Sequence, residues 1–572
     1  MEELSRLCCL AVEDVYGGFL AQIFQHLIQQ GRLSVNQLAQ RCRLPLRQVK
    51  AGIAALIQLR LIFHYTTPDG LSTYQANVHS AYNLIRAGRI VELVARRYGP
   101  AAAKIMEHLA ILGYATADEL EAHVCEDNVL TTSKDSAELT NGHHEEGVLL
   151  GGANPEVRTS FRTALKHLLD DRFISSVRDA HFQSEFDARQ DVERHLQHLG
   201  MLPSAKGKKI QSDIDHRVDV ELESRLDGTV SSASIMQDFE QRDSNENMTY
   251  SQVYLSTIPM LCIDYSNLLA AIRNERVAST AYKLFGQPAA QVARAACSQV
   301  DVDSGPFKIQ SATSAPIQRL NVSQIRSSMA EEATQETLNE EDAENGWLGE
   351  YALNGYADPQ VNGAQHYSQI DQHLAVLAEG PFSFLSQEPG GGQWLLHRSR
   401  LSNFLRDGEL MRFMGESLSG PALRILRMLM DKGKLDEKSL QEIGLLGAKE
   451  LRQCLAQLQL MGYLELQEVP REPQRQPNRT IFLWFYDAER VRKVVLGRLY
   501  KTMARLFQRL HLERERLAST LSKVERTDVQ GSEEEMLSQA ELQVLFKWRQ
   551  KEAWFMTEIN RLDESVVILR DL

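Results

Sequence analysis

Few residues in this 572-residue chain have the types and spacing that catalysis or metal binding requires. Asp213-Ile-Asp215 and Asp301-Val-Asp303 are D-x-D pairs, and carboxylate oxygens at this spacing can hold Mg²⁺. Both pairs lie in polar sequence that resembles linkers, with no companion acids on a predicted strand. We therefore expect neither pair to bind a metal ion.

The signatures of known catalytic sites are missing from the sequence. It contains no G-x-x-x-x-G-K-[ST], no G-x-G-x-x-G and no H-E-x-x-H, and no G-x-S-x-G. Its seven cysteines form no C-x-x-C, which argues against a zinc ribbon and against a disulfide framework. We expect a protein that catalyses nothing alone, uses no cofactor or metal and has no small-molecule substrate.

Acidic residues are concentrated in two segments. The net charge is −13, and residues 126–147 carry six acids and one base, whereas residues 331–350 carry eight acids and no base. Both segments have too few apolar residues to form a core, so we expect disordered insertions there. The rest of the chain is close to neutral, and the net charge does not argue against a nucleic-acid partner.

One early segment is purely basic. Between Asp14 and Asp69 there is no acid, but there are six bases: Arg32, Arg41, Arg43, Arg47, Lys50 and Arg60. Such a cluster on a compact segment is a plausible footprint for a polyanion. Ordinary solvated surface is an equally plausible interpretation.

A pattern of an amphipathic helix, a tight turn and a β-prone run recurs four times. The copies include residues 53–63, 164–174, 370–382 and 451–464. In the first copy, Ser34 is a plausible N-cap and Pro45 opens the third helix. Three helices followed by a two-stranded hairpin form a winged helix, a variant of helix-turn-helix.

The C-terminal segment has a different pattern. Apolar residues three and four apart extend through 487–526 and again through 544–566, with a capping-box signature at Ser532 and Glu535 between them. This pattern predicts two long helices that form an antiparallel coiled-coil hairpin. Trp548 and Trp554 point in different helical directions, so one seam cannot easily bury both, which favours an outside partner for part of the hairpin.

The predicted fold class is mainly α with short β-hairpin wings: four tandem winged-helix domains and a C-terminal coiled-coil hairpin. No run of eighteen apolar residues is present, so we expect no membrane span. The expected domains are winged helix 1 (1–86), winged helix 2 (87–182, with an acidic insertion at 126–153), a helical segment and linker (183–247), winged helix 3 (248–397, with an acidic insertion at about 301–363), winged helix 4 (398–486) and the hairpin (487–572).

This order of parts resembles the winged-helix subunit family of nuclear RNA polymerase III, the largest member of that enzyme's specific three-subunit subcomplex. The matching stretches are Leu7-Cys8-x-Leu10, Asp14-x-Tyr16-Gly17, Gly31-Arg-Leu-Ser-Val, Leu44-Pro45, Val49–Leu59 running into Leu61-Ile62, Arg97-Tyr98-Gly99 and Thr480-Ile-Phe-Leu-Trp484. Each stretch is a hydrophobic pattern with little specificity, and the ordered set is more specific than any member.

The resemblance implies a non-catalytic core subunit in the nucleus. Members of that family lie on the polymerase clamp beside the DNA cleft, help to open promoter DNA and contact the initiation factor bound upstream. The products of the whole enzyme include transfer RNA and 5S ribosomal RNA. The expected partners are the other polymerase III subunits, the initiation factor and DNA.

The residues add a narrower hypothesis about sites. The third helix of a DNA-binding winged helix meets the DNA, and we expect contacts to phosphates that do not depend on base sequence. The predicted DNA-proximal residues are Arg43, Arg47, Lys50, Arg158, Arg162 and Lys166. The predicted partner-binding residues of the hairpin are Leu506, Leu510, Trp548, Trp554 and Phe555. Copies one and two would then face nucleic acid, and copies three and four would face protein.

Three alternatives stay open. A relative of the large subunit of transcription factor IIE would share winged helices but usually carries a zinc ribbon. A scaffold subunit of another large complex would place one winged helix after a helical array. A sequence-specific repressor would need one dominant basic helix and a dimer interface.

Overall fold

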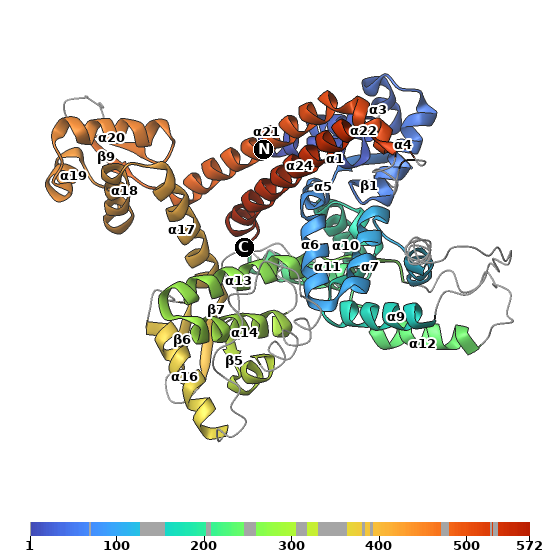
Figure 1. The fold of residues 1–572 in the computed structure, drawn as a ribbon. Coiled ribbons are helices and arrows are strands. Elements are labelled where there is room, and N and C mark those ends of the chain that lie inside the picture. The colour runs from blue at the N-terminus through green and yellow to red at the C-terminus, as the bar shows by residue number, and fades with distance from the viewer. Residues whose placement is uncertain are drawn as a thin grey trace. The chain divides into compact units, whose positions relative to one another are not determined.

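The computed structural model describes residues 2–67, 70–125, 155–201, 208–244, 259–304, 317–329, 363–379, 384–388, 393–470, 480–526, 529 and 536–572. Within them the chain is mainly helical, with four small antiparallel sheets (Figure 1). It forms two compact units. One consists of Glu2–Leu268 and Leu506–Met556, and the other of Leu269–Arg505 and Thr557–Leu572.

The first copy follows its predicted plan closely. Its elements are α2 (Gly18–Gln30), α3 (Val35–Cys42), α4 (Leu46–Gln58), β1 (Ile62–Thr66) and β2 (Ser72–Ala76). Helix α1 (Glu2–Tyr16) precedes them, and α5 (Val78–Asn83), η1 (Leu84–Arg86) and α6 (Ala87–Tyr98) follow. The predicted cap at Ser34 is confirmed, because Ser34 forms a capping box with Gln37. Leu38, Val49, Ile53 and Leu56 are buried between the helices.

The second copy contradicts the expected domain boundaries. Its elements are α7 (Pro100–Leu112), a helix that includes residues 117–125, α9 (Pro155–Asp170), β3 (Ile174–Ser176) and β4 (Leu261–Ile263). Strand β3 pairs with β4 in the register Ile174↔Ile263. The strand that completes this wing therefore lies inside 248–397, the range expected for winged helix 3, and not before residue 182. A three-residue strand is too short to give a periodic signal, which explains the error.

The segment between β3 and β4 is helical rather than a linker. It holds η2 (Asp179–Phe182), α10 (Glu185–His198), α11 (Lys208–Leu226) and α12 (Ser232–Ser244). Helices α10 and α11 share a small core of Ala188, Val192, Leu196, Val218 and Leu222. The linker expected within 183–247 is not seen in the described part of this range, which is mostly helical. Helix α11 buries only about one apolar residue per turn. Its overall composition is therefore polar and resembles that of a linker.

The third copy lies inside its expected range, but part of the insertion expected there is structured. Its elements are α14 (Gln287–Ser304), β5 (Ile317–Leu320), a helix over 322–329, α16 (Gly363–Glu379), β6 (Leu385–Gln387) and β7 (Trp394–His397), and α13 (Ser266–Phe285) precedes them. The strands are ordered β5-β7-β6. Strand β5 and the helix over 322–329 lie within the range 301–363 that was expected to be an acidic insertion. The acidic segments 126–147 and 331–350 lie outside the described residues.

The fourth copy repeats the plan of the first. Its elements are α18 (Gly420–Lys432), α19 (Glu437–Gly444), α20 (Ala448–Leu460), β8 (Glu465–Pro470) and β9 (Thr480–Phe485), and α17 (Arg398–Ser417) leads into them. Three helices followed by a two-stranded hairpin are the plan predicted for the copies.

One local arrangement is common to the four copies among the described residues. The residue two positions before the second helix pairs with the last strand of the wing: Leu33↔Tyr74, Ala115↔Leu261, Leu320↔Trp394 and Leu435↔Trp484. The next residue receives a hydrogen bond near the start of that helix: Ser34 within its capping box, Thr116 from Glu119 N, Asn321 from Ser323 N and Asp436 from Ser439 N. The bridge holds the second helix against the wing, and the cap satisfies an N–H group that the helix leaves open.

The C-terminal helices are α21 (Ala488–Arg516), α22 (Ala518–Val524) and α24 (Gln539–Val566), followed by the π-helix η4 (Val567–Asp571) (Figure 1). Arg514 pairs with Glu552 at 2.9 Å, and Lys523 pairs with Glu541 at 2.6 Å. Lys523 follows Arg514 in the chain, but its partner Glu541 precedes Glu552. This part of α21–α22 therefore runs antiparallel to α24.

A buried carboxylate joins three helices in the unit that contains α13. Glu409 of α17 receives hydrogen bonds from Arg276 of α13 at 2.8 Å and from Ser565 of α24 at 2.6 Å, and it pairs with Arg412. Burial alone would raise the pKa of Glu409, but the hydrogen bonds from Arg412, Ser565 and Arg276 lower it to about 2. The charged carboxylate is therefore the form that this cluster stabilises.

We expect Glu409→Gln to lower the free energy of unfolding of the full chain by about 3 kcal/mol at pH 7, the low end for a broken buried pair because Arg412 remains 47% exposed. The pKa of Glu409 is about 2 in the folded chain against 4.5 as the unperturbed value. The carboxylate thus adds stability above about pH 4.5 that is lost as the pH falls toward 2.

Chemical denaturation at pH 7 and pH 3 measures this difference. The gap between wild type and Glu409→Gln should shrink at pH 3. Glu416→Gln is the matched control, since Glu416 also pairs with Arg412 but is exposed, and it should cost below about 1 kcal/mol. An equal gap at both pH values would contradict this assignment.

Candidate nucleic-acid and subunit interfaces

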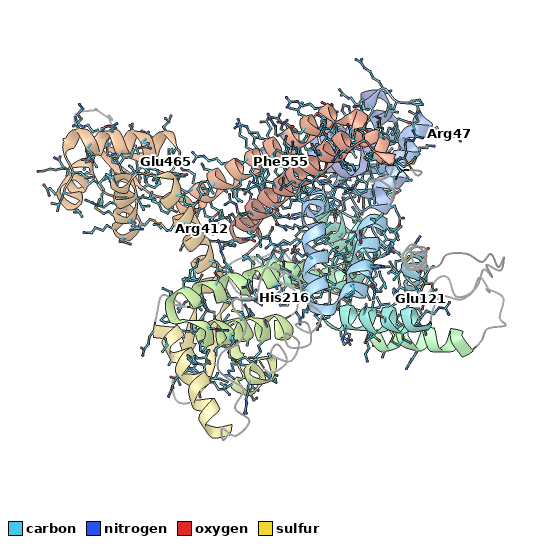
Figure 2. All side chains as sticks on the ribbon, viewed as in Figure 1. Arg47, Glu121, His216, Arg412, Glu465 and Phe555 are labelled. Carbon is cyan, nitrogen blue, oxygen red and sulfur yellow. The ribbon has the colours of Figure 1, made fainter. Side chains whose placement is uncertain are left out.

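The first copy presents four exposed cations along its second and third helices. Arg41 and Arg43 lie at the end of α3, and Arg47 and Lys50 lie one turn apart on α4 (Figure 2 labels Arg47). We call these four residues the basic edge. Within the described parts of the chain, none of the four has an ion pair or a side-chain hydrogen bond. Their charges are therefore available to a partner.

The other two bases of the acid-free segment are used inside the protein. Arg32 donates to both carboxylate oxygens of Asp187, at 2.9 and 2.5 Å. Arg60 donates to Cys262 Sγ at 2.9 Å, which links the first copy to the wing of the second. The six bases counted in the sequence thus reduce to four that face solvent without a counter-ion.

The wing of the first copy is held by α10. Tyr65 Oη of β1 donates to Asp191 Oδ1 at 3.1 Å, and Arg194 Nη1 donates to Tyr65 Oη at 2.7 Å. Together with the Arg32–Asp187 pair, these bonds cover one side of the β1–β2 hairpin with protein. The part of this winged helix that stays open to a large ligand is the α3–α4 side.

In the second copy, the predicted basic face of α9 is partly used within the chain. Arg162 Nε pairs with Glu121 at 3.2 Å, and its guanidinium lies 4.7 Å from the ring centre of Phe239 on α12. Burial and Glu121 raise the pKa of the Cys125 thiol, while a hydrogen bond from Arg158 acts to lower it. Lys166 is exposed and has no partner among the described residues. Helix α12 thus covers the Arg162 side of α9.

The five predicted partner-binding residues of the C-terminal helices differ in their burial. Leu510, Trp548 and Phe555 are buried within the chain and Leu506 is half-buried, whereas Trp554 is 56% exposed. Figure 2 labels Phe555 on α24. The ring of Trp554 lies edge-on to that of Phe555, with centroids 5.1 Å apart. Three of the five residues therefore form core, and Trp554 remains available to a partner.

A second exposed aromatic residue, absent from the predicted set, lies on the same helix. Phe546 is 67% exposed and lies eight residues before Trp554, so Phe546, Gln550 and Trp554 follow one another at four-residue spacing on one face of α24. We call these three residues the outer ridge. The i, i+4, i+8 spacing was visible in the sequence, but the buried residues of the same helix masked it.

A contact between the hairpin and the first helix was also missed. Arg514 of α21 donates to Asp14 of α1 at 2.6 Å while it pairs with Glu552 of α24. Asp14 belongs to one of the stretches that carry the resemblance described above. Its side chain has a structural partner that lies 500 residues away in the sequence.

Neither metal-binding nor membrane-spanning features occur in the described part of the chain. It contains no group of three or more His, Cys, Asp or Glu side chains that could hold a metal ion. None of its helices combines the length and the apolar composition that a membrane crossing requires. Asp213 and Asp215 lie on α11, where Asp215 accepts a hydrogen bond from Gln211 and lies 3.6 Å from Arg189.

Three protein-family models match the chain. The model described as the RNA polymerase III subunit RPC82 helix-turn-helix domain matches residues 6–66, and the one described as RNA polymerase III subunit RPC82 matches residues 163–405. The model described as the POLR3C C-terminal winged-helix domain matches residues 412–486. The first and last of these matches fall on the first and fourth copies.

Curated relatives match over almost the whole length. The DNA-directed RNA polymerase III subunit rpc3 of Aspergillus oryzae is 34% identical over 646 aligned residues, which cover 99% of both chains. The proteins of the same name from Aspergillus clavatus and Aspergillus niger are 32% and 34% identical, also over 99% of both chains.

We expect Leu510→Ala to lower the free energy of unfolding by about 2–5 kcal/mol, because Leu510 is buried and its truncation leaves a cavity. Trp554→Ala should change it by less than about 1 kcal/mol, since more than half of that side chain is already in solvent. Denaturant unfolding of the two variants of the full chain measures the difference. Equal losses would show that Trp554 belongs to the core.

Proposed function

The chain belongs to the RNA polymerase III subunit RPC82 family, and from this premise we propose that it is a non-catalytic core subunit of nuclear RNA polymerase III. In this proposal it acts in promoter opening and in the initiation of transcription of small RNAs, which include transfer RNA and 5S ribosomal RNA. It does so by holding DNA and by joining other subunits through its winged helices and its hairpin.

The observation that carries the DNA part of the proposal is the basic edge. Four cations lie on the third-helix side of a winged helix, the side that meets DNA in this class of domain. None of them has a counter-ion among the described residues, so binding a phosphate would not first require an internal ion pair to break. Arg158 and Lys166 of α9 are proposed as a second, smaller contact, while Arg162 would have to leave Glu121 to take part.

The mode of contact we propose is to phosphates, independent of base sequence. Because α10 covers the wing of the first copy, this domain would hold DNA through the α3–α4 side alone. Four side chains on one surface can neutralise about four phosphates. A contact of this size positions a duplex without reading its sequence, which suits a subunit that serves different promoters.

We also propose the finer architecture and the assembly. The recurrence of the bridge and cap in each copy supports four tandem winged helices, and the antiparallel ion pairs of α21–α22 with α24 support a C-terminal coiled-coil hairpin. The proposed partners are the other two members of the polymerase III-specific heterotrimer, the clamp and the promoter-bound initiation factor. The outer ridge is the proposed contact of the hairpin with another subunit, because two large aromatic side chains on one face are exposed there.

The prediction for DNA uses a pair of variants matched within the chain. Arg47→Glu with Lys50→Glu should weaken binding of the full chain to a promoter-length duplex. It should also reduce the slope of log K against log salt by about 1.8, since each lost phosphate contact removes about 0.9. The control is Lys449→Glu with Arg452→Glu, at the same positions of the fourth copy. A slope that is unchanged in the first variant would exclude this edge as the DNA contact.

The prediction for the hairpin tests the outer ridge. Phe546→Ala with Trp554→Ala should reduce retention of the chain on the remaining polymerase III subunits by about tenfold or more, as loss of aromatic interface anchors does. Phe186→Ala is the control, because Phe186 of α10 is equally exposed. Deleting residues 487–572 is a poorer test, since Arg514 also holds α1. Normal retention of the double variant would reject the ridge as a docking surface.

A further inference from the structure

The first and fourth copies have the same helical frame, residue for residue. Every bound of α18, α19 and α20 lies 402 residues after the matching bound of α2, α3 and α4, as positions 18 and 420 or 58 and 460 show. No insertion or deletion separates the two copies between the start of the first helix and the end of the third. Their side chains can therefore be compared position by position.

The turn between the second and third helices has the same backbone in both copies. Arg43 ends α3 at φ 53°, ψ 37°, and Leu445 ends α19 at φ 51°, ψ 41°. The residues before the third helices, Pro45 and Gly447, have φ −58°, ψ 140° and φ −65°, ψ 143°. A left-handed φ is unfavourable for arginine and for leucine, and it persists only where the surroundings fix it.

The first helix fixes this turn in the same way in both copies. Gln22 Nε2 of α2 donates to the carbonyl of Cys42 at 3.2 Å, and Arg424 Nη1 of α18 donates to the carbonyl of Gly444 at 3.3 Å. These donors and acceptors are again 402 positions apart. The turn is thus held rigidly in each copy, and its outward side chains are presented in a defined direction.

What differs between the copies is the chemistry of those side chains. Positions 41 and 43 carry two exposed arginines, whereas the matching positions 443 and 445 carry isoleucine and leucine. Ile443 is 40% exposed and Leu445 is 87% exposed. We call Ile443 and Leu445 the apolar edge. Leu445 buries little of its side chain against its own chain, so its apolar surface is open to a partner.

The surroundings of the apolar edge do not suit a polyanion. Of the cations at matching positions, Lys449 remains exposed, but Arg452 pairs with Glu437 at 2.5 Å. Glu450 stands where the first copy has Gln48. The excess of positive charge that marks the first copy is therefore absent here. A protein surface with an apolar pocket fits this edge, and a nucleic acid does not.

We propose that the exit of the second helix determines the partner of each winged helix. In the first copy Arg41 and Arg43 bind phosphate, and in the fourth copy Ile443 and Leu445 insert into an apolar pocket on another subunit of the polymerase. This inference rests on the proposed function. It assigns the choice between DNA and protein as partner to two positions in each copy. The rigid left-handed turn is the common platform that presents either pair.

The test exchanges the two pairs in the full chain. Ile443→Arg with Leu445→Arg gives the fourth copy the residues of the first, and Arg41→Ile with Arg43→Leu does the reverse. Each exchange replaces one non-glycine residue by another in the left-handed turn, so the strain of the turn does not change. Both variants should therefore unfold at the wild-type temperature. Retention on the remaining polymerase III subunits, and the salt dependence of binding to a duplex, are then measured for each.

The first exchange should weaken retention on the polymerase by about tenfold or more and leave binding of DNA at the basic edge intact. The second should reduce the salt slope by about 1.8 and leave retention intact. Leu445→Asn serves if the arginine variant unfolds, because asparagine accepts the left-handed turn and removes the apolar side chain.

Normal retention of both fourth-copy variants would overturn the proposal. The proposal would also be overturned if the wild-type chain alone self-associates and Leu445→Asn abolishes this association. The apolar edge would then bind a second copy of the chain. If the wild-type chain itself does not join the polymerase, the proposed function is rejected. This outcome differs from those that reject only the role of the apolar edge.

Discussion

The pairing of one residue with the last strand of the wing organises each of the four copies. In the first copy, Leu33 N donates to Tyr74 O at 3.0 Å and the bond is returned at 2.8 Å. This bridge fixes the start of the second helix, and the capping residue that follows fixes its direction. The third helix then packs across the other two and presents one side to solvent. Without the bridge, the direction in which a basic or apolar edge faces would not be determined.

Internal ion pairs decide which charges of the chain can reach a partner. Arg32 and Arg162 lie in segments that look equally basic in the sequence, but each has an acidic partner from a distant element, Asp187 and Glu121. Asp187 lies on α10 and Glu121 on the helix over 117–125, while Phe239 of α12 lies against the guanidinium of Arg162. The helices α10 and α12, inserted between β3 and β4, thus reduce the basic surface of two winged helices to the edges that remain uncovered.

Helix α24 carries large aromatic side chains on two different faces. The inner face of α24 carries Trp548 and Phe555 into the core, and its outer face leaves Phe546 and Trp554 in solvent. The acids on this stretch are all paired: Glu541 and Glu552 with bases of α21–α22, and Glu558 with Arg561 of α24. The outer ridge is therefore flanked by no free acid within the described residues, and Lys547 on the same face is exposed.

The sequence by itself determined the local elements and the class of the chain. Helical periodicity, the cap at Ser34 and the hairpin strands of the first and fourth copies are short-range properties, so they could be read from neighbouring residues. Likewise, the lack of reactive motifs and the order of the parts were sufficient to indicate a polymerase III subunit family.

Only the tertiary structure decided which strand completes the second wing, which cations remain free and which apolar residues of the hairpin are core. Each of these depends on contacts between residues far apart in the chain, such as Ile174 with Ile263 or Asp14 with Arg514. A local pattern gives the kind of element but not its neighbour. Burial and charge neutralisation are properties of neighbours, and for this reason the functional surfaces could not be separated from the core by sequence alone.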